Sequence, residues 1–301
     1  MNGVRSLRAN ASSTLKNSSF YARLKNSWVR DLYWKVKNPQ LIEVKKKQVE
    51  FYRDLLIGFR PGDVIFDVGA NVGEKTAAFL SMGARVVAVE PDEHNQKILR
   101  GKFIRYRLSR KPVSIVGKAV SEKTSVETMW VDGPGSALNT LSQKWVDTIK
   151  ADKGRFAHTL DVLEFAEKKN VETTTLDHLS AEYGLPFFVK IDVEGYELRV
   201  LRGLRHPVPY LSYEINLPEF RQEGLECLEV LRTLAPDGEC NYASDVSRGL
   251  SLQSWVHAQE LARIIENCCE SSIEVFWRTP SLLQAGPTRG DMSQRTGIPG
   301  F

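Results

Sequence analysis

Two short apolar runs, each followed by a carboxylate, constrain the fold of this chain more than any other feature. Residues 64–66 form a β-branched and aromatic run before Asp67, and residues 86–89 form a second apolar run before Glu90. Runs of this length and composition predict buried strands. If the strands are parallel neighbours, both carboxylates lie at the sheet edge where open α/β sheets bind ligands. The pattern therefore predicts an α/β fold with a ligand crevice at this edge.

A glycine turn follows the first strand. Gly69 and Gly73 bracket it, and a helix is expected over residues 74–82, an arrangement that brings backbone N–H groups close to a ligand. Dinucleotide-binding turns carry a middle glycine where this chain has Asn71, so NAD is disfavoured. A carboxylate beside the turn suits an ammonium group better than a phosphate.

The carboxylate at the end of the second strand completes the ligand prediction. Glu90 can accept hydrogen bonds from both hydroxyls of a ribose. Ammonium, ribose and no phosphate together describe S-adenosylmethionine (SAM). The competing interpretation is an ordinary strand-to-helix turn whose acidic residues only cap helices.

The N-terminal part of the chain is strongly basic. Residues 1–60 contain 13 Lys/Arg against 4 Asp/Glu, whereas the rest of the chain is slightly acidic. We expect residues 1–19 to be mobile and residues 20–57 to be helical, forming a basic arm before a core that begins near residue 61. The arm predicts weak, salt-sensitive contact with anionic surfaces, or simply a solvated face. No RNA-binding motif accompanies it, so we expect no specific nucleic-acid partner.

Targeting and cysteine patterns add little. No apolar run is long enough to span a bilayer, and no secretory signal is present at the start, so a cytoplasmic location is expected. A mitochondrial location is the alternative, because residues 1–30 contain no Asp or Glu. The four cysteines lack metal-binding spacing and no histidine cluster accompanies them. We therefore expect neither a disulfide framework nor a zinc site; no metal ligands are assigned, and the sequence does not specify metal dependence.

Strand and helix patterns alternate along residues 61–279, which predicts one domain with a parallel sheet and helices on both faces. One strand is expected to run from 113 to about 120. Residues 133–172 interrupt the alternation and predict an insertion that contains helices, either a lid or a surface excursion. Residues 273–277 predict an edge strand, and residues 280–301 a flexible tail.

Charged residues occupy the end of a later strand, predicted over residues 187–195. Lys190, Asp192 and Glu194 would share one face if the strand runs that far. Buried charges are costly unless they are paired or bind a ligand, so these residues suggest a function. Glu214 lies near the end of the following strand, over residues 210–215.

Several of these motifs resemble the FkbM family of SAM-dependent methyltransferases over roughly residues 45–235. The glycine turn alone is general among class I methyltransferases, whereas the block with Asp192 and Glu194 is more specific. The motifs are Phe66-Asp-Val-Gly-Ala-Asn-Val-Gly73, Val89-Glu-Pro91, Thr175-Leu-Asp177, Val189-Lys-Ile-Asp-Val-Glu-Gly195, Leu201-Arg-Gly203 and Tyr213-Glu-Ile215.

The resemblance implies a Rossmann-like class I methyltransferase fold, with seven mostly parallel strands in the order 3-2-1-4-5-7-6 and the last strand antiparallel. It implies O-methylation of a hydroxyl on a small molecule, sugar or polyketide-like acceptor. By position, Glu90 would hold the ribose of SAM, and Asp192 and Glu194 would lie on the reaction side. The methionine part of SAM would be surrounded by residues of the first turn, Asp67, Gly69, Ala70, Asn71 and Gly73.

Three carboxylates are candidates for the group that orients the acceptor or takes its proton. Asp192 is the first choice, with Glu194 and Glu214 behind it. The alternative for each is a structural ion pair with Lys190 or a nearby arginine. Two rival functions stay open, a nucleotide-dependent oxidoreductase and a non-catalytic scaffold. The sequence specifies no oligomeric state.

Overall fold

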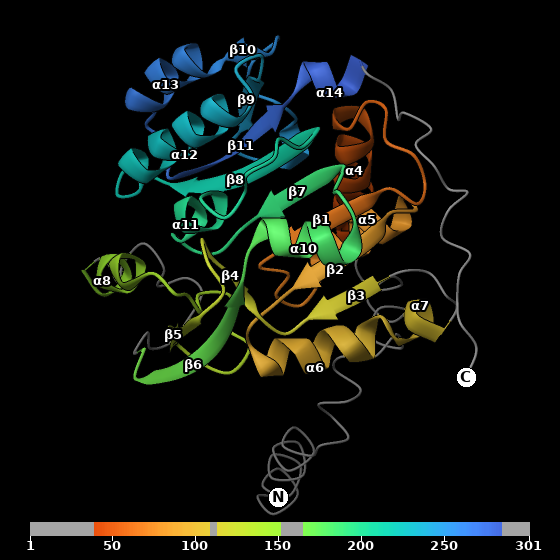
Figure 1. Cartoon of the computed structure of the whole chain (residues 1–301), viewed down its shortest axis with the longest axis vertical. Coiled ribbons are helices and arrows are strands. Elements are labelled where there is room, and N and C mark those ends of the chain that lie inside the picture. The colour runs from red at the N-terminus through yellow and green to blue at the C-terminus, as the bar shows by residue number, and fades with distance from the viewer. Residues whose placement is uncertain (1–38, 109–112, 152–164, 285–301) are drawn as a thin grey trace, which may run out of the picture.

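The computed structural model describes residues 39–108, 113–151 and 165–284. An eight-stranded sheet forms the centre of the molecule, and helices cover both of its faces (Figure 1). A three-stranded sheet and helix α8 (Gln143–Ala151) lie on the side toward which the arrowheads of the parallel strands point. The smaller sheet is therefore placed beside the sheet edge where a ligand crevice is expected.

The central sheet has the predicted order with one addition. Five parallel strands run from one edge to the middle, and β11 is antiparallel to both of its neighbours. A short strand, β10, pairs with β9 and makes eight strands where seven were expected. In spatial order the strands are β10 (Val256–His257), β9 (Glu239–Ala243), β11 (Ser272–Arg278), β8 (Tyr210–Asn216), β7 (Phe188–Ile191), β1 (Val64–Val68), β2 (Arg85–Val89) and β3 (Val113–Val116).

One strand was placed wrongly by the sequence pattern. β11 was expected at an edge, but it hydrogen-bonds to β8 on one side and to β9 on the other. Its residues Val275, Phe276 and Trp277 are correspondingly buried. Burial on both faces is the mark of an interior strand, and the charged Glu274 within the run and Arg278 at its end had favoured an edge position.

Alternate residues of each strand face two separate hydrophobic cores. Phe66 and Val68 of β1 belong to one core, whereas Ile65 belongs to the other. The first core is closed by α10 (Leu176–Tyr183), α11 (Glu197–Leu201), α12 (Arg221–Leu234) and α13 (Ala258–Glu266). The second is closed by α4 (Pro39–Leu55), α5 (Glu74–Ser81) and α6 (Glu93–Lys102), with α7 (Ile104–Leu108) following α6. This arrangement confirms the predicted α/β class.

The smaller sheet corrects two predictions. The strand expected over residues 113–120 is split, because β3 ends at Val116 and β4 (Ala119–Val120) pairs with β6 (Glu167–Thr174) instead. β6 also pairs with β5 (Val126–Val131), so the stretch predicted as an insertion returns to regular structure at Glu167, within its expected bounds. The helix expected within it is α8, which buries Trp145 and Ile149.

The two ends of the described chain are packed rather than separate. Tyr52 of α4 is fully buried against the rings of Phe79 and Phe188, so this part of the basic arm belongs to the second core. The expected tail begins with a short helix, α14 (Pro280–Gln284), whose Ser281 N–H donates to Asp237. The predictions for residues 1–38 and 285–301 lie outside the described residues.

Among the described ranges, no helix combines the length and the apolar composition needed to cross a bilayer.

Candidate functional site

The turn between β1 and α5 repeatedly uses the left-handed backbone region. Gly69, Asn71 and Gly73 have φ values of 80°, 47° and 73°. Asparagine tolerates this region better than most residues, which explains its place in the middle of the turn. At Gly69 an added Cβ would lie 1.8 Å from the carbonyl oxygen of Asp192, so only glycine fits there. The main chain of the turn therefore packs directly against the main chain that follows β7.

Glu90 fixes the same turn from the end of β2. Its Oε2 accepts from the N–H of Asn71 at 2.7 Å, and its Oε1 accepts from the N–H of Asp92 at 2.8 Å. Each carboxylate oxygen has a second lone pair, so both can still accept a hydrogen bond from a ligand. Burial raises the pKa of Glu90 to about 7, against the lowering effect of these two hydrogen bonds.

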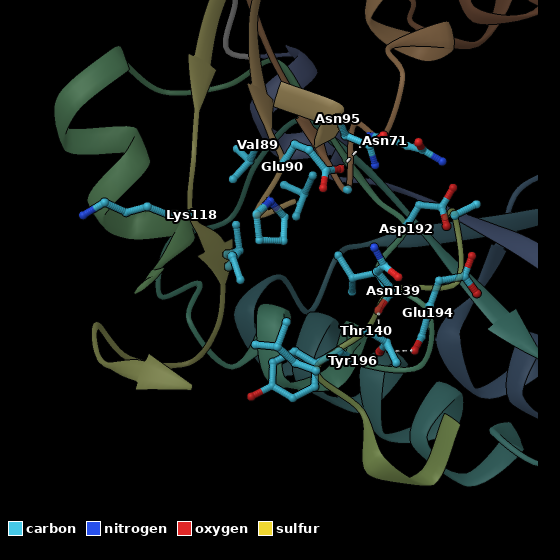
Figure 2. Close-up of a pocket in the computed structure, with 18 of the residues that line it drawn as sticks. Asn71, Val89, Glu90, Asn95, Lys118, Asn139, Thr140, Asp192, Glu194 and Tyr196 are labelled. Carbon is cyan, nitrogen blue, oxygen red and sulfur yellow. Dashed lines mark hydrogen bonds between the residues drawn. The ribbon is translucent and has the colours of Figure 1, made fainter. Parts of the chain in front are cut away.

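A cavity, the first of three, opens beside Glu90 (Figure 2). Two buried oxygens in its lining, Oδ1 of Asn71 and Oδ1 of Asn95, have no hydrogen-bond partner in the described structure. Unpartnered buried acceptors call for donors from a ligand. SAM offers an ammonium group, an exocyclic amine and two ribose hydroxyls, so the residues present fit it.

The residues predicted to surround SAM fall into two groups. Gly69, Asn71 and Glu90 line the first cavity, whereas Asp67, Ala70 and Gly73 are buried and do not line it. That any of the six contacts SAM directly stays a prediction.

Those three residues hold the turn in place. The buried Asp67 accepts a hydrogen bond from Oγ1 of Thr76 at 2.5 Å, which ties β1 to α5. Burial raises the pKa of Asp67, and Lys190 opposes that rise. The N–H of Ala70 donates to Val89, and Gly73 has no room for a Cβ.

Three carboxylates gather where β7 and β8 end. Asp192, Glu194 and Glu214 each place an oxygen within 4.8 Å of the others, and we call them the carboxylate cluster. β7 ends at Ile191, so the strand does not extend to Asp192 or Glu194 as expected, although the ion pair of Lys190 with Asp192 shows that these two side chains lie on the same side. Glu194 reaches the cluster through a left-handed turn with φ 54°.

Charge within the cluster is unevenly balanced. Nζ of the buried Lys190 lies 2.7 Å from Oδ2 of Asp192. Burial raises the pKa of Asp192, but the ammonium group outweighs it and holds that pKa below its ordinary value. Burial and the charge of Asp192 raise the pKa of Glu214 to about 8. The pKa of Glu194 is also raised, by burial and by the charges of Asp192 and Glu214.

Three cavities meet at the carboxylate cluster. Asp192 lines the first cavity and a second one, which also contains Lys75, Lys190, Asp245 and Glu274. Glu194 lines the first cavity and a third one, together with Leu138, Trp145 and Asn216. Glu214 lines the second and the third. A group held by all three carboxylates would thus face every cavity of the site.

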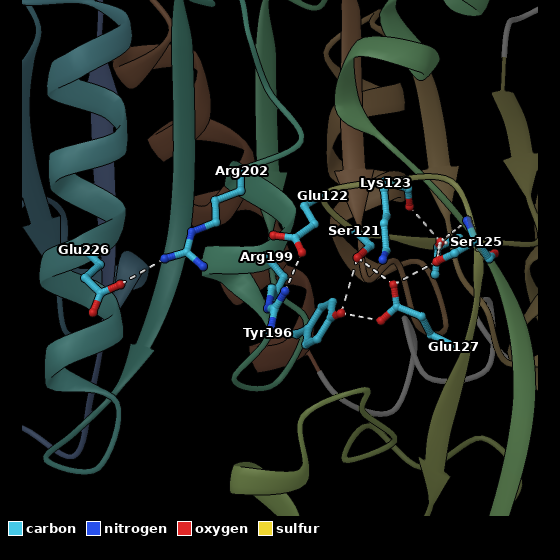
Figure 3. Close-up of polar contacts among 10 residues, drawn as sticks. Ser121, Glu122, Lys123, Ser125, Glu127, Tyr196, Arg199, Arg202 and Glu226 are labelled. Carbon is cyan, nitrogen blue, oxygen red and sulfur yellow. Dashed lines mark hydrogen bonds and ion pairs between the residues drawn. The ribbon is translucent and has the colours of Figure 1, made fainter.

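The smaller sheet supplies part of the cavity wall, which the sequence did not predict. Tyr196 lines the first cavity, and its hydroxyl donates to Glu127 of β5 and lies 3.2 Å from Oγ of Ser121 (Figure 3). An ion pair between Arg199 and Glu122 lies beside this network. These contacts span about seventy residues of sequence. No local pattern could have indicated them.

The predicted insertion also contributes to the site. Asn139 and Thr140 line the first cavity, and Oγ1 of Thr140 donates to the carbonyl of Glu194 at 2.8 Å. Lys118, from the link between β3 and β4, lines the opposite end of that cavity. For Asn139 and Thr140, the position of the insertion beside the crevice was the only signal in the sequence.

A family model described as the methyltransferase FkbM domain matches residues 67–243, which is more than half of the chain. The chain belongs to this family. It is therefore a SAM-dependent methyltransferase with SAM as its cofactor, and the oxidoreductase and scaffold hypotheses are dropped. The eight-stranded sheet described above has the class I arrangement expected for the family.

Two individual relatives share limited sequence identity with this chain. It is 28% identical over 189 residues to the 31-O-demethyl-FK506 methyltransferase FkbM of Streptomyces tacrolimicus, covering 58% of this chain and 68% of that one. It is 49% identical over 44 residues to the ribosomal RNA small subunit methyltransferase A of Anaeromyxobacter dehalogenans, covering 15% of this chain and 16% of that one.

Solved structures show low sequence identity to this chain and low TM-scores. A SAM-dependent O-methyltransferase from Thermotoga maritima is 14% identical with a TM-score of 0.36, covering 77% of this chain and 64% of that one. An O-methyltransferase from Bacillus cereus in complex with SAH is 15% identical with a TM-score of 0.32, covering 79% and 80%.

Proposed function

We propose that this FkbM methyltransferase methylates a hydroxyl group on a small molecule, such as a sugar or a polyketide-like acceptor. The observation that carries the proposal is the carboxylate cluster at the meeting point of three cavities. SAM supplies an activated methyl group. The chain itself must orient a neutral hydroxyl and provide for its proton, and partly buried carboxylates suit both tasks.

The first cavity suits the donor. Glu90, Asn71 and Asn95 offer acceptors for the ribose and for N–H donors. Val89 and Lys118 lie toward one end of the cavity and Asp192 and Glu194 toward the other. A ligand whose ribose is bound by Glu90 would thus have one end directed toward the carboxylate cluster.

Two members of the cluster suit different parts of the acceptor's chemistry. Asp192 is held in its charged form by Lys190, so it suits orienting a hydroxyl through a hydrogen bond. Glu214 has a pKa of about 8, raised by burial and by Asp192, so its ionised form, which predominates only above that pH, is the form that can receive a proton. As the acceptor oxygen bonds to the methyl carbon and the carbon–sulfur bond breaks, the hydroxyl proton is passed to Glu214 or to water.

The other two cavities suit an acceptor with several polar groups. Lys75, Asp245 and Glu274 line the second cavity, and they can form hydrogen bonds with a polyhydroxylated molecule. Leu138 and Trp145 line the third cavity and offer an apolar surface for a ring. This combination supports a glycan or polyketide-like acceptor.

The test combines discovery of the acceptor with one variant. The full-length protein is incubated with cell extract and methyl-labelled SAM, and labelled products are identified by mass spectrometry. We expect a small molecule labelled on oxygen; label confined to nitrogen, carbon or RNA would overturn the proposal. With that acceptor, Glu214→Gln should lower single-turnover transfer by about 10²–10⁴, with SAM affinity preserved. The exposed Glu229→Gln is the matched control.

A further inference from the structure

The carboxylate cluster has the composition of a cation site. The oxygens of Asp192, Glu194 and Glu214 lie within 4.8 Å of one another. Two oxygens that share one Ca²⁺ lie at most about 4.6–5.2 Å apart, and two that share one Mg²⁺ at most about 4.0–4.2 Å apart. The separations among the three carboxylates are therefore within the range that one Ca²⁺ allows. Hard divalent cations prefer such oxygen ligands.

A fourth polar residue lines one of the same cavities. Asn216 lies two residues after Glu214 on β8, so both side chains are on one face of the strand. Its side chain lines the third cavity with Glu194 and Glu214. Asn216 is only 9% exposed, and no described residue forms a hydrogen bond with its side chain. Because its amide atoms are not among the fully buried unpartnered ones, they are open to the third cavity, where a ligand can reach the amide and both carboxylates.

The surrounding charges leave room for a cation. Lys190 pairs with Asp192 through Oδ2, and Oδ1 of Asp192 is not used by that pair. Lys75 lines the second cavity with Glu274 and Asp245, and Glu274 accepts from Ser212. Neither Glu194 nor Glu214 has a basic partner in the described part of the chain. Carboxylates this close repel one another when ionised, and either a proton or a cation held between them relieves the repulsion.

We propose that Asp192, Glu194 and Glu214 bind one hard divalent cation, with the amide oxygen of Asn216 as a fourth ligand. The three carboxylates are only partly buried, so further coordination positions face the cavities and can be taken by water. Cysteine and histidine spacing gave no indication of this site, because its ligands are oxygens from two strand ends and one turn.

The cation would deepen the proposed function, and this part of the inference rests on it. A hydroxyl that replaces one of the waters would be held beside the first cavity. Coordination also lowers the pKa of a bound hydroxyl, so its proton can leave to water. Cation binding itself requires neither SAM nor an acceptor, so it can be tested separately.

The experiment uses the full-length protein after chelator treatment and dialysis. Titration calorimetry with Ca²⁺ and with Mn²⁺, and electron paramagnetic resonance of bound Mn²⁺, should show saturable binding at one site per chain. Glu194→Gln and Glu214→Gln keep the side-chain shape and should each weaken binding by at least about 10-fold, the scale for losing a supporting group. Asn216→Ala should weaken it by about 10-fold.

Glu274→Gln is the matched control, because this carboxylate lies opposite Glu214 on the neighbouring strand but outside the cluster. Its cation affinity should equal that of the wild type. Thermal unfolding verifies that each variant folds, and a bound cation should raise the melting temperature of the wild type but not of Glu194→Gln.

No saturable binding at millimolar cation in the folded wild type would overturn the proposal, as would equal weakening by Glu274→Gln. A cation affinity of Asn216→Ala equal to that of the wild type would remove the fourth ligand. Methyl transfer that is unaffected by chelator, alongside clear cation binding, would overturn the catalytic part while leaving the proposed O-methylation intact.

Discussion

Nζ of Lys190 lies 2.7 Å from Oδ2 of Asp192, and the lysine side chain is 5% exposed whereas the aspartate side chain is 35% exposed. The pair therefore has a buried partner and a partner that faces the cavities. Removing the aspartate charge would leave a buried ammonium without its carboxylate. A substitution of Asp192 can consequently change both the stability of the fold and the rate of methyl transfer, so both must be measured for each variant.

For Asp192→Asn we expect two effects. The free energy of unfolding should fall by about 1–2 kcal/mol, a loss reduced from the fully buried case because Asp192 is partly solvated. Turnover per folded molecule should fall by about 10²–10⁴, with SAM affinity nearly unchanged. Denaturant unfolding and single-turnover transfer on one preparation test this. Near-normal transfer would limit Asp192 to its ion pair.

A double variant separates the two effects. Lys190→Met removes the buried charge that Asp192→Asn leaves unpaired, so the double variant should recover most of the lost stability. It should not recover methyl transfer. Recovery of both would show that the ion pair alone matters.

Glu90→Ala should weaken SAM binding by about 1–3 kcal/mol, the scale for losing hydrogen bonds to a charged group. Part of that loss would come from the turn, because Asn71 also loses its acceptor. Calorimetry of SAM binding gives the value. Glu93→Ala, an exposed carboxylate at the start of α6, is the control and should bind like the wild type. Unchanged affinity in folded Glu90→Ala would exclude Glu90 as the ribose ligand.

SAM affinity should depend on pH through the same residue. The pKa of Glu90 is raised by burial to about 7, and only the ionised form offers two full acceptors to the ribose. Affinity should therefore rise as pH increases through about 7 and level off above it. Glu90→Gln cannot ionise and should lose this dependence. A wild-type affinity that is flat across that range would count against the assignment.

The buried Glu197 predicts a pH effect on stability. Burial raises its pKa from the ordinary 4.5 to about 7, so ionisation in the folded state is disfavoured and wild-type stability falls as pH rises across this window. Glu197→Gln keeps an oxygen for the N–H groups of Val193 and Gly195. Relative to the wild type, its free energy of unfolding should gain about 1–3 kcal/mol between about pH 5 and about pH 8. Urea unfolding at both values measures this, and a constant difference would refute it.

Local patterns predicted the turn side of the site well. Each of the first two strands is a short apolar run, and the turn between β1 and α5 is specified by residues close in sequence. Gly69, Asn71 and Glu90 were placed in the crevice for this reason. The order of the strands in the central sheet was also predicted correctly, but from the family resemblance and not from periodicity.

The rest of the site depends on contacts that no local pattern encodes. β4 has only two residues, and its pairing with β6 joins segments more than fifty residues apart. The network of Tyr196, Glu127 and Ser121 arises from that pairing. Asn216 is an ordinary strand residue in the sequence, and only the fold places it beside Glu194.

The contact between Gly69 and the carbonyl oxygen of Asp192 leaves no space for even a methyl group. The two halves of the site are consequently in direct steric contact through their main chains. A shift of the SAM-binding turn toward β7 must displace Asp192, and with it the carboxylates that face the acceptor. Any side chain introduced at position 69 would therefore disturb the SAM-binding turn and the main chain of Asp192 together.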